Sequence, residues 1–164
     1  MDFPNRGITL KKIGIFALRT CATLVFAMEM EIKQELADAL YKAYKEGLQQ
    51  GRFTSLRDAS RIICKQPAPR YFITPDWARI RLCLLRGGWS MINLSPSVRR
   101  MMLQLSKEYD KFVAEHPGQQ YSVSRIAEII VMQPAPEYYI TPEAVRRILR
   151  KVIRNVRREK GWGD

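Results

Sequence analysis

The chain has 164 residues, of which 46% are apolar and 27% are charged. This length suffices for one small domain or two very small ones, and the apolar fraction excludes a chain that is disordered throughout. The 28 lysines and arginines outnumber the 16 acidic residues, so the net charge is +12. Such an excess favours a polyanionic partner, either nucleic acid or an anionic membrane surface, over a charge that only serves solubility.

Residues 1–29 are predicted to form an apolar and basic N-terminal extension. Its apolar run, Ile13 to Ala27, ends in small residues that fit a signal cleavage site. Arg19 lies in the middle of the run, and the run is shorter than the ~20 residues that a membrane span needs. An upstream extension or peripheral helix is favoured, and a signal peptide and a membrane anchor stay open as alternatives.

The rest of the chain carries one helical unit twice. A shift of 67 residues aligns Ser55–Leu82 with Ser122–Leu149 without a gap, and 13 of the 28 aligned positions are identical. Each copy is centred on Gln-Pro-Ala-Pro-x-Tyr-[Phe/Tyr]-Ile-Thr-Pro-[Asp/Glu]. Such a duplication predicts a mostly all-α fold of two pseudo-symmetric three-helix repeats, residues 30–88 and 89–160.

The first helix of each copy is predicted from an apolar stripe. In the first copy it covers about residues 30–50, and in the second it follows Ser95-Pro96, an N-cap and a proline at the first helical position, and stops at His116-Pro117-Gly118. The residues expected to face the core are Ile32, Leu36, Leu40, Tyr44 and Leu48 in the first copy, and Met102, Leu105, Tyr109 and Phe112 in the second.

The second and third helices are predicted from their caps. Ser55 and Ser122 precede short helices, about 56–65 and 123–132, which the Pro-Ala-Pro sequences terminate. The extended Pro-Ala-Pro-x-Tyr-[Phe/Tyr]-Ile segments that follow are able to pair between the copies. Thr74-Pro75 and Thr141-Pro142 then begin the third helices, which run to about residues 86 and 157.

Basic residues are concentrated in the third helix of the second copy. Residues 144–160 contain a single acid, Glu159, and an apolar stripe that leaves one face for a row of long basic side chains. Guanidinium groups neutralise phosphates and also recognise guanine edges, so this row predicts a nucleic-acid-binding site. The residues predicted to contact nucleic acid are Arg146, Arg147, Arg150, Lys151, Arg154, Arg157 and Arg158.

The aligned helix of the first copy lacks this basic face. Ile80, Cys83 and Leu84 stand where the second copy has Arg147, Arg150 and Lys151. An apolar surface on nearly all sides predicts that this helix is buried or forms an interface. The duplication therefore predicts one copy that packs and one copy that binds.

No residue set predicts catalysis, a cofactor or a metal site. His116 is the sole histidine and follows a helix end, so a capping role is expected for it. Cys21, Cys64 and Cys83 have no metal-ligand spacing, and Cys64 and Cys83 are expected to be small buried residues. We therefore expect a non-enzymatic protein of the reducing cytoplasm with no cofactor and no small-molecule substrate.

Two resemblances bear on function. A short helix, a turn and a longer basic helix in the second copy resemble a helix-turn-helix DNA-binding module, which implies duplex DNA as the partner. The doubled Pro-Ala-Pro-x-[Phe/Tyr]-[Phe/Tyr]-[Ile/Leu]-Thr-Pro motif is similar to a group of small uncharacterised bacterial and phage proteins, which supports the repeat unit. The alternatives are RNA binding and a structural or adaptor module of a phage or mobile element, with a protein partner or self-association.

Overall fold

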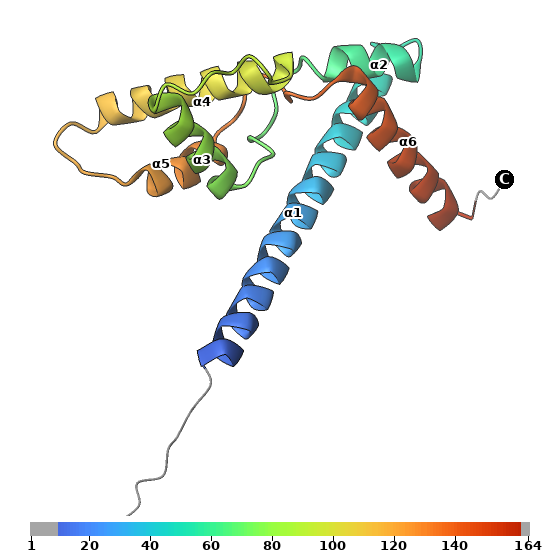
Figure 1. The fold of residues 1–164 in the computed structure, drawn as a ribbon. Helices are drawn as coiled ribbons and strands as arrows, with labels where there is room; N and C mark the ends of the chain where they lie inside the picture. The colour runs from blue at the N-terminus through green and yellow to red at the C-terminus, as the bar shows by residue number, and fades with distance from the viewer. Residues whose placement is uncertain (1–9, 162–164) are drawn as a thin grey trace, which may run out of the picture.

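The computed structural model describes the backbone of residues 10–161 and the side chains of residues 27–161. Over this range the fold is all-α, with six helices and no strand (Figure 1). The helices are α1 Leu10–Gln49, α2 Leu56–Ile63, α3 Pro75–Arg86, α4 Pro96–Glu115, α5 Val123–Val131 and α6 Pro142–Glu159.

Helix α1 begins 20 residues before the predicted start, because most of the predicted N-terminal extension continues the same helix. Its 40 residues span about 60 Å, and its N-terminal half extends away from the other helices (Figure 1). No helix in the described range is apolar over a stretch long enough to cross a membrane. The side chains of the run Ile13 to Ala27, except Ala27 itself, lie outside the described residues.

The predicted stripe of α1 is correct in its middle and wrong at its end. Leu40 is fully buried, whereas Leu48 in the last turn is 48% exposed. The chain reverses there and brings Phe53 back against the helix. Its ring stacks on Tyr44 at 6.1 Å and leaves no room for a side chain at Gly47. The last turn of α1 is thus covered on the side of Gly47, not on the side of Leu48.

The predicted caps of four helices are confirmed. The hydroxyl oxygens of Ser55, Ser122, Thr74 and Thr141 each accept a hydrogen bond from the backbone N–H three residues later, at 3.1–3.2 Å. Ser95 differs, because its side chain makes no capping bond and lies beside the Ser97 hydroxyl instead. Pro96 nevertheless occupies the first turn of α4 as predicted.

The helices of the two copies pack across each other. Helix α2 packs on α6, and α3 packs on α5. Helix α1 contacts α2 and α6, while α4 contacts α5 and α3. One three-helix unit therefore consists of α1, α2 and α6, the other consists of α4, α5 and α3, and the two lie on opposite sides of Figure 1. Each unit takes its first two helices from one copy and its third helix from the other.

The Pro-Ala-Pro segments are the place where the chain crosses between the units. Ala68 and Ala135 form an isolated antiparallel bridge in which each N–H donates to the other carbonyl at 2.9 Å. The pairing that we predicted between the extended segments is thus limited to one residue from each copy. In an antiparallel ladder the next hydrogen-bonded positions lie two residues away. The bridge does not lengthen there, because the N–H groups of Gln66 and Gln133 donate instead to the carbonyls of Ile63 and Ile130 at the ends of the preceding helices.

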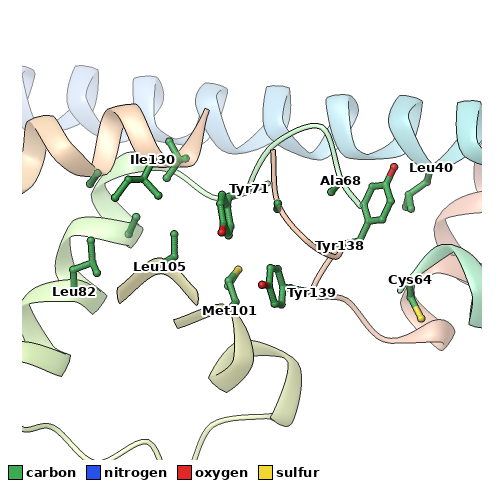
Figure 2. Close-up of a cluster of buried hydrophobic side chains, with 14 of the residues drawn as sticks. Leu40, Cys64, Ala68, Tyr71, Leu82, Met101, Leu105, Ile130, Tyr138 and Tyr139 are labelled. Atoms are coloured by element: carbon green, nitrogen blue, oxygen red, sulfur yellow. The ribbon is translucent and has the colours of Figure 1, made fainter. Parts of the chain in front are cut away.

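Aromatic rings fill the space beside this crossing (Figure 2). Tyr71 stacks on Tyr139 with ring centroids 6.0 Å apart, and Phe72 stacks on Tyr138 at 5.9 Å. Tyr139 has a φ of 54°, a left-handed conformation that costs a non-glycine residue about 1–2 kcal/mol. Packing of its ring holds this backbone in place, whereas the aligned Phe72 has no positive φ.

Tyr71 carries a buried polar atom without a partner. Its side chain is 1% exposed and its hydroxyl makes no hydrogen bond. We expect Tyr71→Phe to stabilise the fold by about 1 kcal/mol at pH 7, a rise in Tm of roughly 2–4 °C, because the variant no longer buries an unsatisfied hydroxyl.

Burial also raises the pKa of Tyr71 far above its usual value of 10. The unfolded wild-type chain therefore ionises first, wild-type stability falls as the pH rises above about 10, and the advantage of the variant grows there.

Thermal unfolding of Tyr71→Phe at pH 7 and urea unfolding at pH 8 and 11 measure both effects. Tyr138→Phe is the matched control, since Tyr138 is the aligned residue and its hydroxyl is not an orphaned buried atom. We expect a smaller change in Tm for the control. A Tm for Tyr71→Phe below that of the wild type would contradict this account of the hydroxyl.

Candidate nucleic-acid interface

Helix α6 exposes a row of basic side chains because its opposite face is buried. The Thr141 cap and Pro142 start the helix, and Glu143 places a negative charge in the first turn, which the helix dipole favours. Val145 and Leu149 are fully buried against the core. Since the helix repeats every 3.6 residues, burial of this stripe directs the basic side chains between its members toward solvent.

The structure brings all seven predicted contact residues onto one exposed surface. Arg146, the first of them, is half-buried at the base of the helix, where α6 meets α2. The other six are exposed: Arg147, Arg150, Lys151, Arg154, Arg157 and Arg158. We call these six residues and Arg146 together the basic face of α6.

The acidic residues of α1 do not neutralise the basic face of α6. Glu35 pairs instead with Arg70, with 3.0 Å between its Oε2 and the arginine Nη1. Asp38 accepts a hydrogen bond from the side chain of Gln34. Among residues 27–161, no ion pair within 4.0 Å involves a basic residue of α6. The basic face is therefore not neutralised by ion pairs within the described part of the chain.

Part of the basic face lines a shallow groove of ≈ 420 Å³ along α6. Glu143 is the single acid in its lining, at the N-terminal end. The other lining residues are basic and come from successive turns of one helix: Arg146, Arg147, Arg150, Lys151 and Arg154. Positive charge of this density, spread along one axis, is suited to a linear polyanion.

Two further arginines adjoin this surface and were not predicted. Arg57 and Arg61 of α2 lie beside Arg146 at the start of α6. They belong to the first copy, and no local pattern relates them to a helix that begins about 80 residues later. Only the packing of α2 on α6 brings them together.

The aligned helix of the first copy, α3, was predicted to be buried or to form an interface, and it is only partly buried, which leaves the interface alternative open. Only Ala78 and Leu82 are buried in it, because one stripe suffices to cover α4 and α5. Ile80 is 47% exposed and Cys83 is also exposed, so the expectation of a buried Cys83 is wrong, whereas that of a buried Cys64 is confirmed. Apart from Arg79, which aligns with Arg146, the α3 surface that corresponds to the basic face of α6 therefore exposes the apolar side chains of Ile80 and Cys83.

Helices α5 and α6 follow one another as in a helix-turn-helix module, but they do not pack together. In the described part of the chain α5 contacts α3 and α4, and the short helix against α6 is α2. The reason is the extended Pro-Ala-Pro connection, which carries the chain from one three-helix unit into the other. A short helix does support α6, but it comes from the first copy.

The tyrosines of the repeated motif and His116 pack against other parts of the fold. Tyr138 and Tyr139 are buried in the aromatic centre, so they are not available for stacking on exposed bases. His116 lies at the end of α4, where its Nδ1 is 2.8 Å from the carbonyl oxygen of Phe112 and its ring stacks on that residue. Within the range that the structure describes, no three His, Cys, Asp or Glu residues are grouped to hold a metal ion.

Over residues 10–161 these features define an all-α fold, and among the side chains of residues 27–161 the basic face of α6 makes no ion pair. Comparisons with protein-family models, with curated proteins and with solved structures find no match for it. The functional argument therefore depends on the geometry and charge of the chain itself.

Proposed function

We propose that the chain is a non-enzymatic nucleic-acid-binding protein that holds duplex DNA against the basic face of α6. The observation that carries the proposal is that its seven basic residues face solvent, or are half-buried in the case of Arg146, without a carboxylate within ion-pair distance among the described residues. Arginines held in this way displace counterions from phosphates, and the release of those counterions drives binding.

A duplex is favoured over a single strand for two reasons. Helix α6 is 18 residues long, about 27 Å, and an α-helix fits the major groove of B-form DNA. Single-stranded binding usually adds aromatic rings for base stacking, but the tyrosines of the repeated motif are buried. The row of guanidinium groups contacts the backbone, and its forks also reach guanine edges in the groove.

The salt dependence of duplex binding tests the proposal. If most of the seven residues contact phosphates, affinity for a duplex oligonucleotide should fall by about 10³ between 50 and 200 mM salt. Fluorescence anisotropy with a duplex, a DNA single strand and an RNA hairpin of equal length measures this, and the duplex should bind most tightly. Absence of duplex binding at 50 mM salt would refute the proposal.

An adaptor role is the second candidate, and the exposed apolar side chains of α3 favour it. Ile80 and Cys83 lie open there, and Trp77 is half-buried on the same helix. A protein partner held by this surface would stay bound after nuclease treatment and at high salt. We expect Ile80→Asp to release such a partner and to leave duplex binding unchanged, as a pull-down and the anisotropy assay would measure.

A further inference from the structure

A small pocket lies where α2 meets the first turn of α6. It has a volume of ≈ 90 Å³, roughly the space of three water molecules. Ser60 forms part of its wall, and its buried hydroxyl donates a hydrogen bond to the Arg57 carbonyl at 2.8 Å. The charged groups in the lining are Arg57, Arg61, Arg146 and Glu143.

The three positive charges of this pocket are only partly balanced, because Glu143 supplies a single negative charge. None of the three arginines lies within 4.0 Å of a described carboxylate, Glu143 included. Three guanidinium groups around so small a space repel one another, and an anion between them would turn that repulsion into attraction. Guanidinium forks match the oxygen geometry of phosphate and form short, charge-assisted hydrogen bonds with it.

The aligned positions in the other three-helix unit show that the fold does not require this cluster. Ser124 and Glu128 stand in the places of Arg57 and Arg61. Arg79, which aligns with Arg146, pairs with Asp76 at 3.4 Å, and Glu128 pairs with Arg125 at 2.9 Å. The same helix packing is thus formed with neutralised charges on one side and with concentrated positive charge on the other.

The pocket is continuous with the basic groove of α6, since Arg146 and Glu143 line both. We infer that Arg57, Arg61 and Arg146 form a binding site for one phosphate group. The assignment of this phosphate to a nucleic-acid backbone rests on the proposed function. Contacts of this kind set the register and orientation of a helix on the duplex, so α2 would fix the N-terminal end of α6 against the strand.

The test compares two double variants of the full chain that have the same net charge. Arg57→Gln with Arg61→Gln changes the pocket and leaves the basic face of α6 intact. Arg79→Gln with Arg125→Gln removes two arginines from the aligned surface of the other unit. We expect the pocket variant to bind duplex DNA about tenfold more weakly, with a salt slope lower by about one, and the control to change less than about twofold. Equal losses in the two variants would overturn the inference.

Inorganic phosphate is the second probe. Titration of the wild-type chain at constant ionic strength, followed by NMR of the arginine Nε–H groups, should shift the signals of Arg57, Arg61 and Arg146. A chloride titration should not shift them, and the pocket variant should lose the response of Arg146. Phosphate shifts without duplex binding would support the pocket and refute the proposed function. Duplex binding with equal losses in both variants, and no specific phosphate shift, would refute the pocket alone.

Discussion

Neutralising three arginines of the basic face should lower duplex affinity by several hundredfold at 0.1 M salt. The triple variant is Arg147→Gln, Arg150→Gln and Arg154→Gln. Each lost phosphate contact reduces the salt slope by about 0.9, which at 0.1 M salt corresponds to a loss of duplex affinity of about eightfold per contact. All three side chains are exposed, and glutamine has a helix propensity close to that of arginine. The helix and the Tm should therefore be retained while binding is lost.

The control for this variant removes the same charge elsewhere. Lys33, Lys107 and Lys111 are exposed residues of α1 and α4, and their replacement by glutamine also lowers the net charge by three. Anisotropy titrations at three salt concentrations give the affinity and slope of both variants. We expect the control to keep the wild-type slope within experimental error. Equal losses in the two variants would mean that net charge, and not the face of α6, determines binding.

Separating the two copies should abolish cooperative folding of each. Cleavage of the chain between Trp89 and Ser90, in the loop between α3 and α4, leaves α2 without α6 and α3 without α5. Burial of Leu149, Val145, Leu82 and Ile130 depends on those pairings, and each large apolar side chain contributes about 1.5–3 kcal/mol. The sum for four such residues approaches the total stability of a small domain.

The experiment uses residues 1–89 and 90–164 as separate polypeptides. Circular dichroism of each should show reduced helicity and no sharp thermal transition, and an equimolar mixture should regain both with a concentration-dependent Tm. Independent, cooperative folding of residues 1–89 as a monomer would contradict the crossed packing of the two copies. It would instead favour repeats that fold as consecutive units.

Local chemistry made much of the fold predictable. The threonine and serine caps and the prolines that follow Thr74 and Thr141 predicted the starts of α2, α3, α5 and α6 to the residue. The start of α1 was missed, because a sequence that resembles a targeting segment also satisfies the requirements of a helix. Cys83 was misjudged because an apolar residue on a helix is buried only where another element covers it.

The candidate site was predictable in part for the same reason. The basic face of α6 is contained in one helix, so its periodicity in the sequence predicted the exposed row. The position of Arg57 and Arg61 beside α6 depends on the crossing at Ala68 and Ala135. The proline on each side of these alanines allows the crossing but does not specify it. Pairing of α2 with α6, and not of α5 with α6, is decided by tertiary packing over a long sequence separation.

The crossed packing of α2 on α6 also has a consequence for synthesis. During translation α1 and α2 leave the ribosome before α3, α4 and α5, whereas α6, the helix that covers them, leaves it after all of these. The other unit, made of α3, α4 and α5, is contiguous in the sequence and can assemble first from local contacts. The three-helix unit that carries the basic face should therefore fold last, and its rate should be limited by closure of the long loop between α2 and α6.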